Sequence, residues 1–544
     1  MRRRRRVFPS TSVRLSRRDL LKLGLGVAGA TALGDLALPG TARAKDLPRT
    51  LIRFTPFTRP LPIPGDGISV LRPVAPFTTS CQFAPGATPN FYTLTMRRAP
   101  VEIIPGVQTP IFGYDGEYPG PTILGRLGTP DVVRQVNALD IETSVHQHGG
   151  HNPSDSDGLP CADQLIFPGA SKDYCYPNDP CRGTDGTPDP NDNPSTLWYH
   201  DHATDITGEN VYRGLAAFYP TTDALEDQLI ADHVLPSRDG DVVLDIPVAL
   251  QDRRFNADGT LFFDPFQHDG FLGDVFVANG KAQPFFKVQR RKYRFRFLIG
   301  TNARVYMLRF SSGLPFLQIA ADSWLLPFAI PRGDRILLAM AERADVIVDF
   351  RNAPDELFLE NIVVQDGGRG PDGDLADPDV RIPGTPLIKF IVEGSPVAND
   401  ATVQPGTPLR PNTPILANEI VATRTFEFNR SQGAWQVNGR FYDENRADAT
   451  PRIGTAERWI LKNGGGGWWH PIHIHLEAHQ VQSFNGRKPP IYNSFKKDTT
   501  LLGPGDVAEV FIRFRDHPGR FVTHCHNLEH EDDRMMFRWD VVAP

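Results

Sequence analysis

The sequence HCHNLEHEDDRM, which begins at His524, constrains the fold of this chain more than any other segment. In an extended strand successive side chains point to opposite faces, so His524 and His526 share one face and Cys525 takes the other. The thiolate of Cys525, with His530 and Met535, supplies three of the four ligands of a blue copper centre, and the thioether favours copper over zinc. The two flanking imidazoles face away and need a second metal. The fold must therefore place this strand between two metal sites.

Three other groups of histidines can supply the remaining ligands: His146–His148, His200–His202 and the sequence HPIHIH that ends at His475. Two imidazoles at positions i and i+2 of a strand lie about 6.5 to 7 Å apart, which suits neighbouring ions better than one ion. These groups therefore predict a polynuclear cluster. In the third group His473 shares a face with His475, while His470 is an odd number of positions away and points oppositely. His470 is thus predicted to complete the blue site.

The motifs HQHGG, WYHDH, HPIHIH and HCHNLEHEDDRMM resemble those of the multicopper oxidases, and most of all the bilirubin oxidase and bacterial spore-coat laccase branch. The resemblance covers nearly all of the chain beyond its N-terminal segment and implies four copper ions. For type 1 copper it implies the ligands His470, Cys525, His530 and Met535. For type 2 copper it implies His146 and His473. For the type 3 pair it implies His148, His200, His202, His475, His524 and His526.

The resemblance also implies an electron path. A reducing substrate loses one electron at a time at type 1 copper, and Cys525 passes the electrons to His524 or His526. Four electrons reduce dioxygen to water. The substrates implied are phenols, aminophenols or bilirubin-type tetrapyrroles, which are small aromatic reductants.

Three further residues match positions that this branch uses. Glu531 and Asp157 are predicted to deliver protons to the cluster. The alternative is that these carboxylates only orient the metal-bound histidines. Trp468, two residues before His470, is predicted to form the substrate-facing rim of the blue site, with a packing role as the alternative. His151 and the other histidines outside the motifs are predicted to be structural or surface residues.

The pattern of apolar residues predicts an all-β chain. Its 50 prolines and 48 glycines separate short apolar runs such as Val242–Ile246 and Ala508–Ile512, which are typical of strands. The sequences FVANG at 276–280 and WQVNG at 435–439 resemble each other and indicate an internal repeat. Together with the resemblance, this indicates three cupredoxin-like domains, each a Greek-key β-sandwich.

Two breaks in composition divide the chain: residues 221–240 are acidic and predicted to form a loop, and residues 393–414 are rich in proline and threonine and predicted to form an extended linker. We predict an export signal over 1–44, followed by domains over 45–222, 223–395 and 396–544. All ligand motifs then belong to the first and last domains, so the family's trinuclear cluster would lie between these two. On this division the middle domain is a spacer.

The N-terminal segment predicts export. Ser16–Lys22 contains two arginines and precedes an apolar run over 23–33, and Ala42–Ala44 offers the small residues of a cleavage site. This order resembles a twin-arginine signal, and the run is too short to span a membrane. The twin-arginine export machinery is therefore an expected partner, and the periplasm or the extracellular space is the expected location. The alternative is a basic arm that binds nucleic acid.

Charge and cysteine content agree with an exported protein. The formal net charge of −6 becomes more negative once the basic N-terminal segment is removed, which argues against nucleic acid as a partner. With Cys525 assigned to copper, four cysteines remain and allow three disulfide connectivities. The short spacing of one pair favours Cys175–Cys181, which leaves Cys81–Cys161 as the second predicted disulfide.

Three other functions remain open on the sequence. An exported oxidase of cuprous or manganous ions would use the same ligands, but only six methionines offer soft ligands for copper(I). A non-catalytic copper carrier would be expected to lose ligands, and here all are present. A copper nitrite reductase lacks the type 3 pair.

Overall fold

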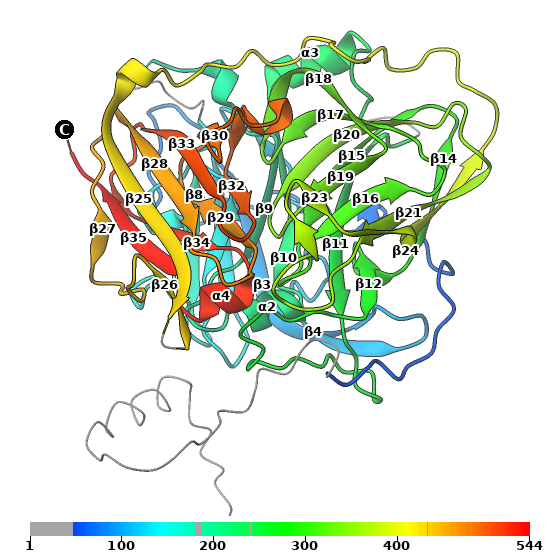
Figure 1. Ribbon diagram of the computed structural model, residues 1–544, viewed down its shortest axis with the longest axis horizontal. Helices are drawn as coiled ribbons and strands as arrows, with labels where there is room; N and C mark the ends of the chain where they lie inside the picture. Colours follow the sequence, from blue (N-terminus) through cyan, green and yellow to red (C-terminus); the bar gives the residue numbers. More distant parts are fainter. Residues whose placement is uncertain (1–46, 180–186, 239–241, 432, 544) are drawn as a thin grey trace, which may run out of the picture. The chain divides into compact units, whose positions relative to one another are not determined.

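A computed structural model describes residues 47–179, 187–238, 242–431 and 433–543, which all belong to one compact unit of the chain. Within these residues three pairs of β-sheets follow one another along the chain, and the helices between them are short (Figure 1). This confirms the prediction of an all-β protein built from three sandwiches. The predicted export signal lies outside the described residues.

The first sandwich contains two four-stranded sheets, in the orders β4-β3-β6-β8 and β5-β10-β9-β7. The strands are β3 (Asn90–Glu102), β4 (Gln108–Tyr114), β5 (Gly125–Arg126), β6 (Asp131–Asn137), β7 (Val145–His148), β8 (Ser171–Tyr176), β9 (Thr196–Asp201) and β10 (Ala216–Thr222). Side chains from both sheets form its core, among them Leu94, Val133 and Tyr199. Two of its strands, β7 and β9, carry histidine motifs.

The second sandwich pairs a seven-stranded sheet, β13-β12-β11-β15-β20-β17-β18, with a five-stranded sheet, β14-β24-β21-β16-β19. The strands are β11 (Asp245–Arg253), β12 (Val275–Ala278), β13 (Lys281–Ala282), β14 (Phe285–Gln289), β15 (Lys292–Ile299), β16 (Tyr306–Phe310), β17 (Phe316–Ala321), β18 (Trp324–Gly333), β19 (Arg335–Leu338), β20 (Arg343–Asp349), β21 (Glu356–Val363) and β24 (Val380–Glu393). Phe295, Phe350 and Phe390 contact one another at the centre of its core.

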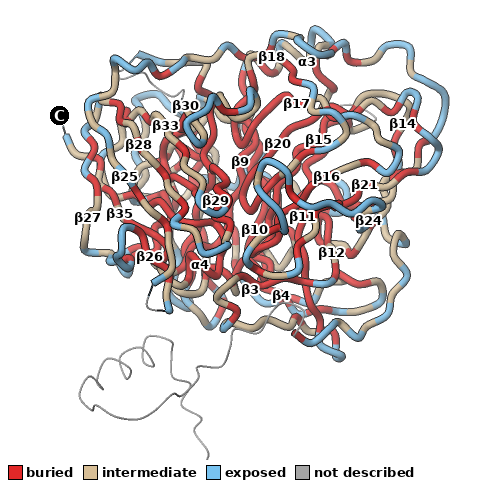
Figure 2. Tube along the Cα trace, in the orientation of Figure 1, coloured by how far each residue is buried: buried red, intermediate tan, exposed pale blue. Residues whose placement is uncertain are grey.

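The third sandwich pairs a six-stranded sheet, β26-β25-β28-β33-β30-β31, with a five-stranded sheet, β27-β35-β34-β29-β32. The strands are β25 (Ile420–Ser431), β26 (Ala434–Val437), β27 (Ala447–Ala449), β28 (Thr455–Asn463), β29 (His470–Ile474), β30 (His479–Phe484), β31 (Lys496–Lys497), β32 (Thr499–Leu502), β33 (Val507–Phe514), β34 (Gly519–Cys525) and β35 (Met536–Val541). Along β33 burial alternates residue by residue, as its apolar pattern predicts. In contrast, β9 and β29 are buried along their whole length (Figure 2).

The two sequences of the predicted internal repeat form the same kind of hairpin, one in the second sandwich and one in the third. Asn279-Gly280 and Asn438-Gly439 all have positive φ, the conformation that a tight two-residue hairpin turn requires. Each asparagine side chain also accepts a hydrogen bond from the backbone of the neighbouring long strand, Asn279 from Ala249 N (2.7 Å) and Asn438 from Glu427 N (2.8 Å). The sequence repeat therefore corresponds to a repeated local structure.

The two predicted breaks differ in structure. Within 221–240, where we expected a loop, Ala224–Ala231 form helix α3. The side chain of Asp223 accepts a hydrogen bond from Glu226 N (2.9 Å) and so caps this helix. In contrast, residues 394–416 carry no helix or strand, as expected of a linker. The domain boundaries themselves stay predictions.

Both predicted disulfide pairings are wrong. Cys81 is bonded to Cys175, with 5.5 Å between their Cα atoms, while Cys161 is a buried free thiol whose Sγ lies 3.5 Å from the Tyr442 hydroxyl. Cys181 lies outside the described residues. Short spacing along the chain misled the prediction, because the cysteine bonded to Cys175 lies 94 residues away in the sequence.

This disulfide should stabilise the first sandwich. It closes a long loop, so replacing both cysteines in Cys81→Ser/Cys175→Ser is expected to cost about 2–4 kcal/mol of unfolding free energy. Calorimetry of the copper-free protein should show a lower unfolding temperature for the variant. Wild-type protein treated with a thiol reductant should behave like the variant. An unchanged unfolding temperature would contradict a stabilising role.

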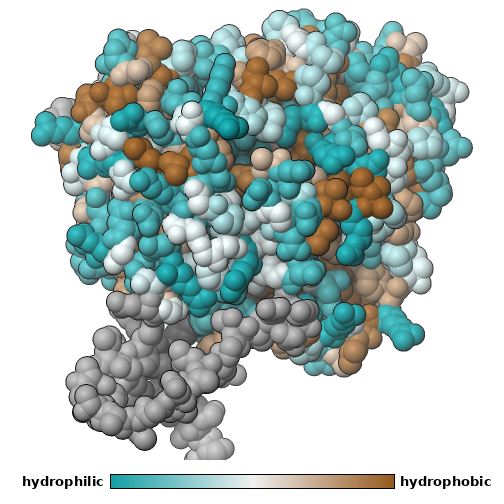
Figure 3. All heavy atoms as spheres, viewed as in Figure 1, coloured by the Kyte–Doolittle hydropathy of each residue, from teal (hydrophilic) through white to brown (hydrophobic). Residues whose placement is uncertain are grey.

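The described surface is mixed in polarity. The face drawn in Figure 3 is mostly hydrophilic, with separate hydrophobic groups. Single exposed apolar residues, such as Leu51, Phe266 and Val421, are normal on a folded protein. Among the described residues, none of the helices has the length and apolar content needed to cross a bilayer.

Candidate metal centres

Strand pairing places the histidine motifs side by side within each sandwich. In the first, β7 pairs with β9 so that His146 lies opposite His200. In the third, β29 pairs with β34 so that His473 lies opposite His524. The two sandwiches meet at these strands, because only 3.4 Å separates Nε2 of His146 from Nε2 of His473. The structure thus brings all four motifs to one interface between the first and third sandwiches.

The histidines form compact groups at this interface. Each group holds three residues whose ligand atoms all lie within 4.8 Å of one another. Two of the groups are His148 with His200 and His526, and His202 with His475 and His524. In the second of these, Nε2 of His524 lies 3.2 Å from Nε2 of both His202 and His475. Ring nitrogens from separate strands therefore point at common positions, as ligands of one ion do.

The hydrogen bonds show which ring nitrogen is left for a metal. Nδ1 of His200 lies 2.8 Å from Asp201 O, and its Nε2 has no hydrogen-bond partner among the described residues. The ring of His148 is turned the other way, with Nε2 3.2 Å from Asp498 Oδ1 and Nδ1 without a partner. Buried polar atoms are nearly always paired, so these bare nitrogens fit metal ligands.

The same burial keeps these rings in the form that binds metal. Desolvation lowers the pKa of His200 to about 3, that of His202 to about 4 and that of His470 to about 3. The rings are therefore neutral near pH 7, and a neutral ring nitrogen has the lone pair that coordinates an ion.

A second, smaller group lies on the other face of β34. The Cys525 Sγ lies 3.4 Å from Nδ1 of His470 and 3.5 Å from Nδ1 of His530, and 3.1 Å separates the two nitrogens. Burial raises the pKa of the Cys525 thiol, so its thiolate needs a nearby cation such as a metal ion. The alternation predicted for the strand is thus seen, with Cys525 directed away from the group that contains His524.

Met535 returns to Cys525 through a short helix. Helix α4 (Leu528–Asp532) follows the strand, after which Met535 N donates to His530 O (2.9 Å) and Cys525 N donates to Met535 O (3.0 Å). The Met535 side chain is buried in the same apolar cluster as Cys525. The loop that carries three of the four predicted type 1 ligands is therefore closed by its own backbone.

Both predicted acidic residues lie against the histidines. Asp157 Oδ2 is 2.7 Å from His475 Nδ1, and its backbone oxygen is 2.6 Å from His146 Nδ1. Glu531 Oε2 is 3.1 Å from His524 Nδ1. Burial favours the neutral form of Glu531, but the nearby histidines outweigh it and lower the pKa of this carboxyl group below its usual range. Each carboxylate contacts a predicted ligand, and proton delivery stays a hypothesis.

Trp468 packs against the apolar cluster that contains Cys525 and Met535. Its ring is half-buried and lies 5.1 Å from the ring of Trp435, which in turn lies 3.8 Å from His530 and 5.5 Å from His470. The guanidinium of Arg369 lies 4.4 Å above Trp468. Trp435 was not among the predicted site residues, although it belongs to the repeated sequence WQVNG. Trp435 thus contacts both Trp468 and the rings of His470 and His530.

Asp498 also contacts the predicted ligands, although it was not among the predicted site residues. Its backbone oxygen is 2.9 Å from His473 Nδ1, and its carboxylate contacts His148. Arg343, from the second sandwich, donates to that carboxylate, with 2.8 Å between Nη1 and Oδ1. Neither residue lies in a histidine motif, so no local pattern signals them.

The remaining histidines are those predicted to be structural or surface residues: His151, His233, His268, His479 and His517. His151 Nε2 lies 2.6 Å from Asp516 Oδ1, and His479 Nε2 lies 2.7 Å from Thr500 Oγ1. Each of these two rings thus has a hydrogen-bond partner within the protein, as expected of a structural residue.

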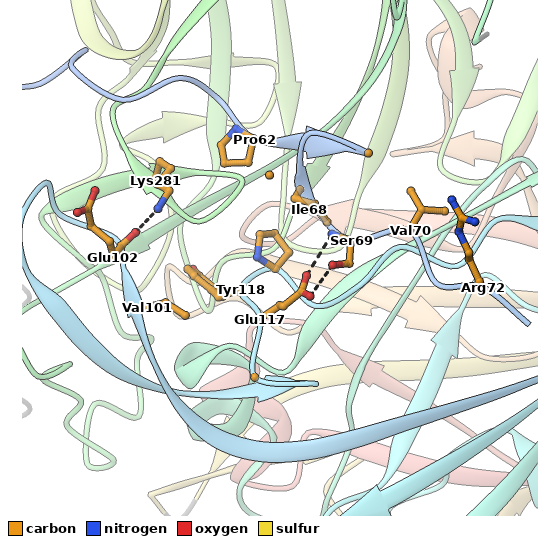
Figure 4. A pocket seen from close by; sticks show the side chains of 14 residues that line it. Pro62, Ile68, Ser69, Val70, Arg72, Val101, Glu102, Glu117, Tyr118 and Lys281 are labelled. Carbon is orange, nitrogen blue, oxygen red and sulfur yellow. Dashed lines mark hydrogen bonds between the residues drawn. The ribbon is translucent and has the colours of Figure 1, made fainter. Parts of the chain in front are cut away.

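A surface pocket has a volume of about 710 Å³, and Figure 4 shows the side chains that line it. It is lined by residues near β1 (Ile63–Pro64) and β2 (Gly67–Ile68) and by Lys281. None of its lining residues belongs to a histidine motif, and Glu117 in it already accepts hydrogen bonds from Ser69. The metal groups are buried and separate from this pocket.

Comparison with known proteins agrees with these groups. Family models described as multicopper oxidase match residues 95–223 and 412–544. A bilirubin oxidase of Albifimbria verrucaria is 36% identical over 537 residues, which cover 93% of this chain and 87% of that protein. A laccase of Bacillus subtilis (strain 168) is 30% identical over 521 residues, covering 84% and 95%. A laccase structure from Pediococcus acidilactici has a TM-score of 0.75 at 28% identity, covering 91% and 96%.

The chain belongs to the multicopper oxidase family. This confirms the resemblance drawn from the four motifs, including its branch, and the cupredoxin-like nature of the sandwiches. The protein is a copper-dependent oxidoreductase with dioxygen as its electron acceptor.

Proposed function

We propose that this protein is a laccase- or bilirubin oxidase-like enzyme that oxidises phenols, aminophenols or bilirubin-type tetrapyrroles and reduces dioxygen to water. The observation that carries the proposal is the position of Cys525. Its sulfur lies within 3.5 Å of two imidazoles on one side, while its sequence neighbours His524 and His526 belong to separate three-histidine groups. A single strand therefore joins an electron-accepting site to a polynuclear one.

The proposed occupancy is four copper ions. Type 1 copper is assigned to His470, Cys525, His530 and Met535, and type 2 copper to His146 and His473. One type 3 ion is assigned to His148, His200 and His526, and the other to His202, His475 and His524. Copper supplies one-electron redox chemistry at the first site and dioxygen reduction at the other three.

The chain's own residues perform the remaining tasks. Cys525 connects the sites through two short backbone paths, to His524 and to His526. Asp157 orients His475 and His146 through its side chain and backbone oxygens. Glu531 lies close enough to His524 to exchange protons with groups in the cluster, and we assign proton delivery to Glu531 and Asp157.

The proposed electron-entry surface is formed by Trp468. Its half-buried ring and the Arg369 guanidinium above it form a flat, polarised contact for an aromatic reductant. Trp435 contacts both Trp468 and His530. The two tryptophans would then connect a stacked substrate to the type 1 site.

Oxidation of cuprous or manganous ions is the competing activity, and a non-catalytic copper-binding protein is a weaker alternative. All five methionines within the described residues are buried: Met96, Met307, Met340, Met535 and Met536. The described surface thus offers no thioether to a copper(I) substrate, whose preferred ligands are soft.

A substrate panel on copper-saturated protein tests the proposal. We expect oxygen consumption with bilirubin or substituted phenols to exceed that with cuprous or manganous salts, and about four coppers per chain by metal analysis. Faster turnover of a metal ion than of every aromatic would favour the competing activity. Full copper content without oxygen uptake on any substrate would indicate a carrier.

The assignment of Met535 as a type 1 ligand predicts a shift of the type 1 potential when this residue is replaced. Met535→Leu removes the weak thioether ligand, which stabilises copper(II), so the reduction potential should rise while the blue colour persists. A redox titration followed by the blue absorption measures this shift. Met536→Leu is the matched control, because Met536 is also buried but packs in a different cluster, with Cys161. Equal potentials in both variants would contradict the assignment.

We also propose export to the periplasm or the extracellular space through the twin-arginine machinery. The support is the order of basic, apolar and small residues over 16–44, together with a disulfide, which is typical of oxidising compartments. Replacing Arg17 and Arg18 with lysine should keep the protein in the cytoplasm of a bacterial host, as cell fractionation would show. Unimpaired export of this variant would contradict the assignment.

A further inference from the structure

The middle sandwich contacts the histidine cluster through one arginine. Arg343 begins β20, and its guanidinium donates to both carboxylate oxygens of Asp498, which directly precedes β32 of the third sandwich. Both side chains are buried. This ion pair joins the second sandwich, which holds none of the predicted ligands, to a residue that touches two of them.

Other bonds fix the position of the Arg343 guanidinium. Nη1 donates to Ala341 O (2.9 Å), Nε to Thr196 O (3.2 Å) and Nη2 to Ser323 Oγ (2.6 Å). Thr196 belongs to β9 of the first sandwich, so Arg343 contacts all three sandwiches. A guanidinium held by this many hydrogen bonds has one orientation. It therefore fixes the orientation of the Asp498 carboxylate, to which it donates two hydrogen bonds.

A second set of contacts fixes the backbone beside Asp498. Asp322 Oδ2 accepts hydrogen bonds from the backbone nitrogens of Asp498 (3.0 Å) and Thr499 (3.1 Å). Lys497 pairs with Glu342 (3.0 Å) and with Asp322 (3.3 Å). The segment 497–499 is therefore held by charged residues of the middle sandwich on both sides of Asp498.

Asp498 in turn contacts two imidazoles from different sandwiches. Its backbone oxygen is 2.9 Å from His473 Nδ1, and its Oδ1 is 3.2 Å from His148 Nε2. These contacts leave His473 Nε2 beside His146 and leave His148 Nδ1 bare. Asp498 therefore determines which nitrogen each of the two rings presents to the cluster.

We propose that Arg343 is a positioning residue for the trinuclear copper cluster, acting through Asp498 on His148 and His473. The inference rests on the proposed four-copper site. It also replaces the expectation that the middle domain is a spacer. Without the arginine, the carboxylate of Asp498 loses the two donors that fix its orientation, so it is free to turn away from His148. That change releases His148 from the orientation in which Nδ1 faces the cluster.

Arg343→Met in the full-length, copper-loaded enzyme tests this role. Outer contacts of this kind are worth roughly 10–100-fold in metal affinity or activity. We expect the blue type 1 absorption and its anaerobic reduction by substrate to persist. The type 2 EPR signal and the near-ultraviolet absorption of the type 3 pair should weaken, and reoxidation by dioxygen should slow about tenfold or more.

Arg294→Met is the matched control. Arg294 is equally buried, lies on the neighbouring strand β15 and pairs with Glu226 and Asp345, but it contacts no predicted ligand. We expect lower thermal stability in this variant with type 2 and type 3 signals like those of the wild type. Equal loss of these signals in both variants would overturn the proposal, as would wild-type signals and reoxidation in Arg343→Met.

A second pair of variants covers the case in which Arg343→Met does not fold. Asp498→Asn removes the charge that needs the arginine, so the double variant Arg343→Met/Asp498→Asn leaves no unpaired carboxylate. Because both substitutions break one interaction, the double variant should lose no more trinuclear signal than Asp498→Asn alone. Additive losses would overturn the proposal. If wild-type protein itself lacks the type 2 and type 3 signals, the proposed function fails. If the signals are lost only in the variants, the result bears on the role of Arg343 and leaves the proposed function intact.

Discussion

Replacing Cys525 with serine is expected to abolish the blue colour and substrate-driven oxygen consumption together. The buried sulfur contacts both His470 and His530 on one side and is joined through the backbone to His524 and His526 on the other. A serine oxygen is a poor ligand for the soft site and cannot replace the thiolate in the electron path. Activity should therefore fall to that of copper-free protein, as oxygen-electrode measurements with a phenol would show.

The chain contains a matched control for this experiment. Cys161 is also a buried free thiol, but its sulfur contacts Tyr442 and none of the predicted ligands. Cys161→Ser should keep the blue absorption and the turnover number. The type 2 EPR signal should remain in Cys525→Ser, because His146 and His473 contact different residues. Blue colour in Cys525→Ser would refute the type 1 assignment.

The parts of the site that follow from local geometry could be predicted from the sequence. Alternation along one strand separates Cys525 from His524 and His526, and an odd spacing separates His470 from His473. The structure shows both separations. These predictions needed only the strand period and the chemistry of the ligands, and both are encoded in a few consecutive residues.

Contacts between distant segments could not be predicted in this way. Asp498 lies in a lysine- and threonine-rich segment with no histidine, and Arg343 lies in another sandwich. Their pairing depends on how three sandwiches pack, which no periodicity records. The same reason explains the wrong disulfide, because the 94-residue separation of Cys81 and Cys175 carries no local signal. Family resemblance implied the ligands, and the division into domains left the middle domain as a spacer.

Glu531→Gln should slow oxygen reduction without altering electron entry. The carboxylate of Glu531 lies 3.1 Å from His524 Nδ1 and 3.6 Å from His202 Nε2, while the type 1 ligands lie on the opposite face of β34. An amide keeps the shape of the side chain but cannot carry a proton. Loss of a general acid typically costs roughly a hundredfold or more in rate. Stopped-flow measurements should find normal anaerobic reduction of the blue site and slow reoxidation by dioxygen.

Glu529→Gln separates proton delivery from a general effect of changing helix α4. Glu529 lies two residues earlier on the same helix and is also buried, but its oxygens accept hydrogen bonds from Phe271 N (3.0 Å) and Asn302 Nδ2 (2.7 Å), outside the histidine cluster. We expect reoxidation at the wild-type rate in this variant. If Glu531→Gln loses type 3 copper, the carboxylate only orients His524. If it keeps full copper and wild-type turnover, Glu531 does not deliver protons, and Asp157 becomes the remaining candidate because it is the other predicted acid in contact with the cluster.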